Sequence, residues 1–128
     1  MRRGKLTLRT ARGAHVLDIE IAVTPWEQQM GLMFARRIPE NAGMLFLYAG
    51  SQEVTMWMKD TYVSLDMVFI KADGEVHRIE AHTTPLSKAA IASRGDVAAV
   101  LELAAGSADR LGLQPGDRVV HPAFASPE

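Results

Sequence analysis

Hydrophobic and polar positions alternate along much of the chain, with the period of two that is typical of β-strands with one buried face. Two alternating segments, residues 5–10 and 15–23, flank Arg12 and Gly13 and predict an antiparallel hairpin. Further apolar or alternating runs predict strands at residues 43–48, 54–59, 65–71, 75–81, 97–103 and 118–121. About eight short strands with no long helix between them favour an α+β fold dominated by a mostly antiparallel, barrel-like sheet.

Two short helices and one long loop interrupt this pattern. Thr24, Pro25 and Glu27 have the spacing of an N-cap, a first helical position and the third helical position of a capping box. That spacing gives Glu27 a structural explanation as a capping residue. The second helix is expected at residues 106–111, and residues 82–96 lack periodicity and are expected to form a long loop.

The length of 128 residues and the hydrophobic content of 48% suit a single domain over residues 1–128 that buries its own core. Residues 1–4 and 122–128 are expected to be loose ends. No apolar run approaches the roughly 20 residues of a transmembrane helix, so a membrane-spanning segment is not expected.

The charge distribution argues against nucleic acid as a partner. The chain carries 14 basic and 15 acidic residues, but residues 1–12 contain five of the basic ones and no acidic one. The remaining nine basic and 15 acidic residues give the rest of the chain a net charge of −6. Binding to phosphates requires clustered Lys and Arg on the folded body, so no nucleic-acid partner is expected.

No metal or cofactor is expected from the residues available. The chain contains no cysteine, which excludes disulfides, thiolate metal sites and cysteine nucleophiles. His77 and His82 are five residues apart and would lie on opposite faces of a strand, which disfavours zinc. Thioethers can bind Cu(I), but Met56 and Met58 fall on the expected core face, where methionine commonly fills gaps.

The stretch from residue 54 to residue 66 concentrates the side chains that can carry chemistry. In a strand over residues 54–59, Trp57 and Lys59 share the face opposite to the core. An indole surrounded by a cation, carboxylates and a hydroxyl suits a sugar or another small polar ligand. The candidate binding residues are Glu27, Arg36, Trp57, Lys59, Asp60, Thr61 and Asp66. A purely structural explanation stays open, because Asp60 and Thr61 can form a turn, Lys59 and Asp66 can pair, and Trp57 can be core.

Three functional hypotheses are compatible with these residues. The leading one is a non-catalytic small-ligand binding or accessory domain, because no nucleophile or metal set accompanies the aromatic and polar cluster. The first alternative is a hydrolase of a sugar-like substrate, with Glu27 and Asp66 about 5–10 Å apart across a cleft. The second is a protein-interaction module, which predicts an exposed apolar patch on the 82–96 loop. The ligand, the protein partner and the presence of catalysis stay open.

Several motifs occur in a fixed order between residues 24 and 120. They are Thr24-x-x-Glu27-x-x-x-Gly31-Leu32-Met33, Gly43-Met44-Leu45-Phe46, Trp57-Met58-Lys59-Asp60-Thr61, Leu65-Asp66 with Phe69, Val100-Leu101-Glu102-Leu103, Gly106 and Gly116-Asp117. In these motifs the chain resembles the domain of unknown function 192 family of small prokaryotic proteins. It departs from the family pattern at Met56, where phenylalanine is usual, and at Asp60, where asparagine is usual.

The resemblance supports the expected domain but implies no activity, because the family has none established. Many members look exported, so the resemblance implies a periplasmic or secreted location, with a leader that is absent from this chain. The residues themselves leave a cytoplasmic location open.

Overall fold

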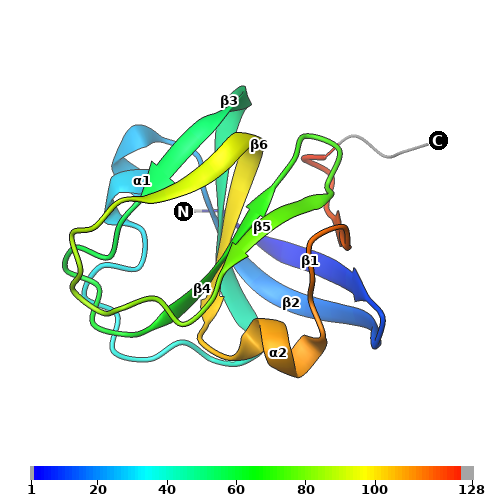
Figure 1. Ribbon diagram of the computed structural model, residues 1–128, viewed down its shortest axis with the longest axis horizontal. Helices are drawn as coiled ribbons and strands as arrows, with labels where there is room; N and C mark the ends of the chain where they lie inside the picture. Colours follow the sequence, from blue (N-terminus) through cyan, green and yellow to red (C-terminus); the bar gives the residue numbers. More distant parts are fainter. Residues whose placement is uncertain (1, 125–128) are drawn as a thin grey trace.

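The computed structural model describes residues 2–124, in which strands dominate and two short helices are present (Figure 1). The elements, in chain order, are β1 (Arg2–Thr10), β2 (Gly13–Ala22), α1 (Pro25–Met30), β3 (Ala42–Met56), β4 (Leu65–Ile70), β5 (Val76–Glu80), β6 (Ile91–Ala104), α2 (Ser107–Leu111) and β7 (Arg118–Val120).

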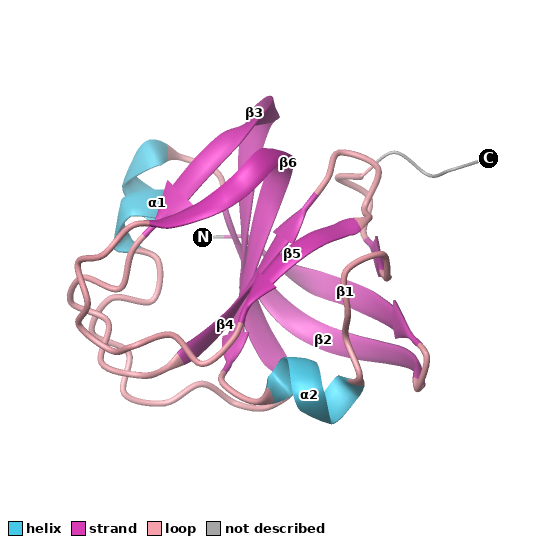
Figure 2. Ribbon diagram, in the orientation of Figure 1, coloured by secondary structure: helices cyan, strands magenta, loops and turns pink. Residues whose placement is uncertain are grey.

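Seven strands in the described residues form one sheet with the order β5-β4-β6-β3-β2-β1-β7. Neighbouring strands are antiparallel except β2 and β3, which run parallel. The sheet curls into a half-barrel, with α1 and α2 at separate places on its outside (Figure 2). The α+β, barrel-like class expected from the sequence is therefore confirmed, with seven strands in place of about eight.

Strands β3 and β6 are longer than the periodicity predicts. Residues 43–48 and 54–56 belong to one strand, because β6 pairs with both parts of β3 across a register shift between Leu47 and Gln52. Residues 91–96, expected in a long loop, extend β6 and pair with the far end of β3. Positive φ angles at Gly50 and Gly95 mark the irregular positions that break the alternation of side chains.

The hairpin formed by β1 and β2 is confirmed, and its first strand begins earlier than expected. Arg2 pairs with Ile21, so residues 2–4 belong to β1 and are not a loose end. Near the other end Phe124 is buried, which ties residues 122–124 to the core. Residues 125–128, also expected to be loose, lie outside the described residues.

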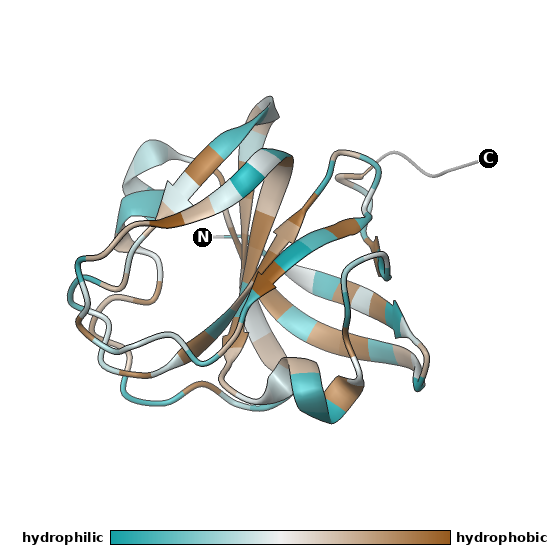
Figure 3. Cartoon of the chain, viewed as in Figure 1, coloured by the Kyte–Doolittle hydropathy of each residue, from teal (hydrophilic) through white to brown (hydrophobic). Residues whose placement is uncertain are grey.

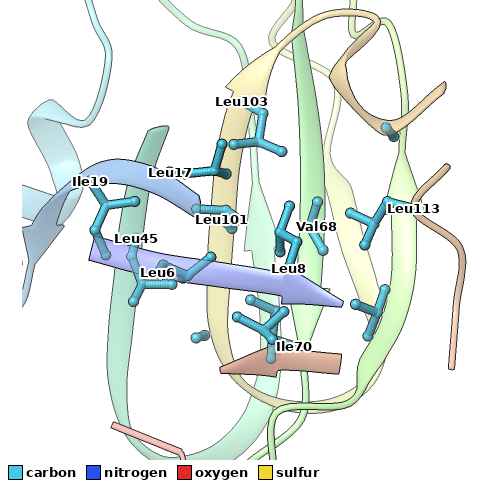
Figure 4. Packing of buried hydrophobic residues seen from close by; sticks show 14 of the residues in the cluster. Leu6, Leu8, Leu17, Ile19, Leu45, Val68, Ile70, Leu101, Leu103 and Leu113 are labelled. Atoms are coloured by element: carbon cyan, nitrogen blue, oxygen red, sulfur yellow. The ribbon is translucent and has the colours of Figure 1, made fainter. Parts of the chain in front are cut away.

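Buried hydrophobic side chains form two clusters. In one cluster Leu101 and Leu103 of β6 pack with side chains of the β1–β2 hairpin, including Leu8 (Figure 4). In the other, Val100 of β6 packs with side chains that include Phe46, Met58, Met67 and Phe69. Strand β6 lies mid-sheet and is apolar along most of its C-terminal half (Figure 3). An acidic side chain in that half is therefore conspicuous.

Among residues 2–124, neither helix has the length and apolar character needed to cross a membrane.

Candidate functional site

Helix α1 begins with the capping box that the sequence predicts. Thr24 Oγ1 accepts a hydrogen bond of 3.1 Å from the backbone N–H of Glu27. Glu27 Oε1 in turn accepts bonds of 3.0 Å from the backbone N–H groups of Thr24 and Val23. These backbone bonds lower the pKa of Glu27, the bond from Thr24 contributing most. The carboxylate of Glu27 therefore caps its own helix.

Helix α1 is fastened to the sheet by its second turn. Gln28 Nε2 donates to the backbone oxygen of Leu47, 2.5 Å away in β3. Gly31 ends the helix with a φ of 45°, and a β-carbon there would lie 3.1 Å from the Phe46 ring. The close approach of Gly31 to Phe46 lets the end of α1 lie directly against β3.

The segment after β3 leaves the sheet earlier than expected. Strand β3 ends at Met56, so Trp57 and Lys59 are not strand residues. The side chains still alternate in burial, because Met58 is fully buried and Trp57 is 47% exposed. A turn follows, in which Thr61 Oγ1 donates to the backbone oxygen of Lys59 at 3.1 Å. Lys59 Nζ lies 5.3 Å from the centre of the Trp57 ring, a cation–π contact.

Helix α1, strand β3 and the segment that follows β3 form the walls of an open cleft of about 250 Å³. Three of the seven residues proposed from the sequence line it, namely Trp57, Lys59 and Thr61. The other lining residues are Gln28, Gln29, Met30, Gly31, Met33, Phe46, Tyr48, Thr55, Met56 and Glu102. The cleft thus combines aromatic and thioether surface with a small number of polar groups.

Glu102 of β6 supplies the acidic group of this cleft. Glu102 is buried, with 4% of its surface exposed. Its carboxyl group forms no hydrogen bond or ion pair with the described residues. Burial raises the pKa of Glu102 to about 8, because desolvation disfavours the charged form. The carboxyl group is therefore mainly protonated at neutral pH.

The surroundings of Glu102 are apolar apart from the cleft. Its direct partners in the neighbouring strands are Met44 of β3 and Met67 of β4. Tyr48 also lines the cleft and donates from its hydroxyl to Met56 Sδ at 3.5 Å. Burial, and to a smaller extent the charge of Glu102, raise the pKa of Tyr48 to about 12. Glu102 was not among the candidate residues expected from the sequence, and the signal that marks it there is its place as the single acid in the apolar run Val97–Leu103.

Asp66 has a different position from the one expected. It is fully buried, and its Oδ1 accepts from the N–H of His82 at 3.0 Å. Its Oδ2 accepts from the N–H groups of Gly106 and Ala108 at 3.1 and 2.9 Å. Asp66 therefore joins β4 to the start of α2 and does not line the cleft. Its contacts are with backbone N–H groups and not with Lys59, the pairing that the structural explanation had left open.

Arg36 and Asp60 also lie outside the cleft lining. The guanidinium of Arg36 is 5.1 Å from the centre of the Tyr62 ring, and the Tyr62 ring is 6.1 Å from that of Phe34. Asp60 has a φ of 55°, and its backbone oxygen accepts from the N–H of Phe34. Both residues therefore shape the loop next to the cleft. In residues 2–124 no group of three or more His, Asp or Glu side chains is arranged to hold a metal ion.

Comparison with known proteins gives a family match over residues 7–121, to an uncharacterized ACR known as DUF192. The chain belongs to the DUF192 family. No curated protein matches this DUF192 chain. A crystal structure of a candidate transcription regulator from Sinorhizobium meliloti 1021 is 45% identical, with 93% of each chain covered and a TM-score of 0.90. A protein of unknown function from Novosphingobium aromaticivorans DSM 12444 is 36% identical, with coverage of 93% of this chain and 85% of the other and a TM-score of 0.90.

The DUF192 motifs converge on the cleft in this protein. Gly31, Phe46, Trp57, Thr61 and Glu102 come from four separate motifs and all line it. Glu27 belongs to the motif that contains Gly31, and Asp66 to the separate Leu65-Asp66 motif, and both accept backbone hydrogen bonds. The motifs therefore comprise one group that frames the fold and one that faces the cleft.

Proposed function

We propose that this DUF192 protein is a non-catalytic small-ligand binding or accessory domain, and that the cleft beneath α1 is its ligand site. The main support is the carboxyl group of Glu102, which lies almost fully buried at this cleft without a partner in the described residues. Among the described residues, Arg78 Nε is the one fully buried side-chain nitrogen or oxygen without a partner, so the Glu102 carboxyl oxygens are reached from the open cleft. A polar ligand in the cleft would therefore give this carboxyl group the hydrogen-bond partner that the protein does not supply.

The size and lining of the cleft fit a small molecule. Its volume of about 250 Å³ exceeds the ~150 Å³ of an engineered protein cavity that accommodates benzene. Ligand sites generally combine apolar and aromatic walls with a small number of polar groups that fix orientation. Here Phe46, Met30 and Met56 supply the apolar wall, and Glu102, Thr61 and Lys59 supply polar groups.

The alternative functions have less support. A hydrolase using Glu27 and Asp66 requires both carboxyl groups at one cleft, but neither lines it and both accept backbone bonds. An interaction surface on residues 82–96 requires an apolar patch, but in the described chain Leu86 is the one large apolar side chain exposed there. The acidic balance beyond residue 12 gives no reason to extend the regulator description of the Sinorhizobium protein to this chain.

A thermal-shift screen with two tryptophan variants tests the proposal. The panel contains sugars, amino acids, amines and nucleotides, and Trp57→Ala is compared with Trp26→Ala. Trp26 is the matched control, since it is 68% exposed and does not line the cleft. We expect at least one compound to raise the Tm of the wild type and of Trp26→Ala, because binding to the native state stabilises it, and to leave Trp57→Ala unchanged. A compound that stabilises both variants equally would place binding elsewhere, and a panel with no stabilising compound would count against the site.

A further inference from the structure

Glu102 is the acidic residue of the cleft, and the other charged or titratable side chains that line it are Tyr48 and Lys59. Tyr48 hydrogen-bonds to a methionine sulfur, and Lys59 lies over the Trp57 ring, so neither is paired with Glu102. From the adjacent strands, Met44 and Met67 flank Glu102 directly. Among the described residues no cationic side chain forms an ion pair with Glu102, and Lys59, the one cation that lines the same cleft, contacts the Trp57 ring instead.

The remaining lining favours a cation as the partner of an ionised Glu102. Phe46, Tyr48 and Trp57 contribute aromatic surface, and aromatic faces attract cations through the ring quadrupole. Lys59 already uses the Trp57 ring in this way, with Nζ 5.3 Å from its centre. The thioether of Met56 adds polarizable surface against which a hydrocarbon group can pack.

We propose, building on the proposed function, that the cleft binds a small organic ammonium ion whose charged group pairs with Glu102 and whose hydrocarbon part packs on the aromatic and methionine wall. Where Glu102 is protonated before binding, its O–H bond breaks and the proton leaves to solvent. The resulting carboxylate pairs with the ammonium group, which keeps all its protons. Binding of the cation and release of one proton are therefore linked.

Three probes of similar size and different charge test this inference. They are benzylamine, benzyl alcohol and benzoate, each titrated into ¹⁵N-labelled protein and followed by amide chemical shifts at pH 6, 7 and 8. Benzylamine stays cationic over this range. Because Glu102 ionises with a pKa of about 8, its charged fraction rises nearly tenfold between pH 6 and pH 7, and the Kd of benzylamine should fall by about the same factor. Benzyl alcohol should bind more weakly than benzylamine at pH 8, with little pH dependence, and benzoate most weakly.

Glu102→Gln provides the matched variant, since it keeps the shape of the side chain and removes the ionisation. It should lose the preference for benzylamine and the pH dependence, while its Kd for benzyl alcohol should stay within about twofold of wild type because the apolar wall is unchanged. If the variant does not fold, a measurement on the wild type alone tests whether the ammonium ion pairs with Glu102. Saturating benzylamine should lower the pKa of the Glu102 carboxyl group, followed by its ¹³C chemical shift, by at least one unit.

The possible failures separate the inference from the proposed function. Equal, pH-independent binding of benzylamine and benzyl alcohol at the cleft would retain the ligand site and overturn the ammonium ion. Preferred binding of benzoate would assign recognition to Lys59 and overturn it equally. If none of the three probes shifts cleft amides but a compound from the thermal-shift panel does, the ammonium inference alone is rejected. If neither the probe titration nor the thermal-shift screen detects binding, both the ammonium inference and the ligand site are rejected.

Discussion

Two carboxyl groups are buried in the sheet, and their surroundings differ. Asp66 is fully buried, and its two carboxyl oxygens accept three backbone N–H bonds. Glu102 is buried to nearly the same extent but has no such donors among the described residues. Burial raises the pKa of Glu102. Asp66 instead connects β4 to His82 and to the start of α2 through its hydrogen bonds. Hydrogen-bond donors, not burial alone, therefore decide what each acid does.

Glu102 should make the protein less stable as pH rises. Its folded pKa of about 8 lies above the unfolded value of about 4.5, so the native state binds more protons between these two values. The stabilising contribution is complete below the unfolded pKa and is lost as pH rises toward the folded pKa. Urea unfolding should show a loss on the order of a few kcal/mol from pH 5 to pH 8.

Glu102→Gln should remove most of this pH dependence, since glutamine does not ionise. Glu53→Gln, at an exposed position of β3, is the control and should keep the wild-type slope. Equal slopes in wild type and Glu102→Gln would show that Glu102 is not a buried neutral acid.

Asp66→Asn should destabilise the protein by about 3 kcal/mol, because an amide replaces one of the acceptor oxygens with a donor that faces backbone N–H groups. The measurement is urea unfolding at pH 7. Asp18→Asn is the control, since Asp18 is exposed and pairs with Lys5, and exposed pairs contribute at most about 1 kcal/mol. A loss as small as that of the control would mean that the three backbone bonds contribute little.

The sequence indicated the region of the candidate site more accurately than the individual residues that line it. Trp57, Lys59 and Thr61 line the cleft proposed as the site, although Trp57 and Lys59 lie beyond the end of the strand that the pattern predicted for them. Asp66 and Glu102 are each a lone acid in an apolar strand, which marks both residues, but only the neighbouring chain decides which one meets backbone donors. Such neighbours lie about 40 residues away, as with Gly106 and Asp66, and leave no local pattern.

At the scale of elements, α1 forms one wall of the cleft although it has only six residues and none of them is buried. So short a helix is marginal on its own, and its cap and the Gln28 bond to β3 hold it in place. The sequence predicted this cap because Thr24 and Glu27 are close in the chain. It missed the joining of residues 42–56 into one strand, because the register shift after Leu47 interrupts the alternation.

Thr24→Ala should therefore affect the cleft as well as stability. Losing the N-cap side chain costs about 1 kcal/mol. It should also loosen the wall of the cleft, seen as faster amide hydrogen exchange at Gln28 and Gly31 with little change in β6. Thr24→Ser keeps the capping oxygen and should behave like wild type. Unchanged exchange in Thr24→Ala would show that the Gln28 bond holds α1 without the cap.

At the scale of the whole molecule, the two ends of the strand order meet. Strands β5 and β7 are the outermost strands, yet Val119 N–H donates to the Gly74 oxygen and Val76 N–H donates to the Asp117 oxygen, both at 2.8 Å. The half-barrel is thus fastened at one point next to β5. Gly74, with a φ of 91°, lies at this point, and a β-carbon there would be 2.5 Å from the Val119 oxygen.

Gly74→Ala should consequently weaken the contact between the two ends of the sheet. Gly50→Ala is a matched control, because Gly50 has a nearly equal φ of 87° but a β-carbon added there would meet no atom within 4 Å. Both variants bear the strain of a left-handed backbone, roughly 1–2 kcal/mol, whereas only Gly74→Ala forces β7 away, at a further 1–3 kcal/mol. Urea unfolding should rank Gly74→Ala below Gly50→Ala, with amide exchange accelerated at Val119. Equal losses in the free energy of unfolding would mean that backbone strain alone matters at Gly74 and that β7 moves aside at little cost. The curvature of the sheet would then depend on the hydrophobic core beneath β1.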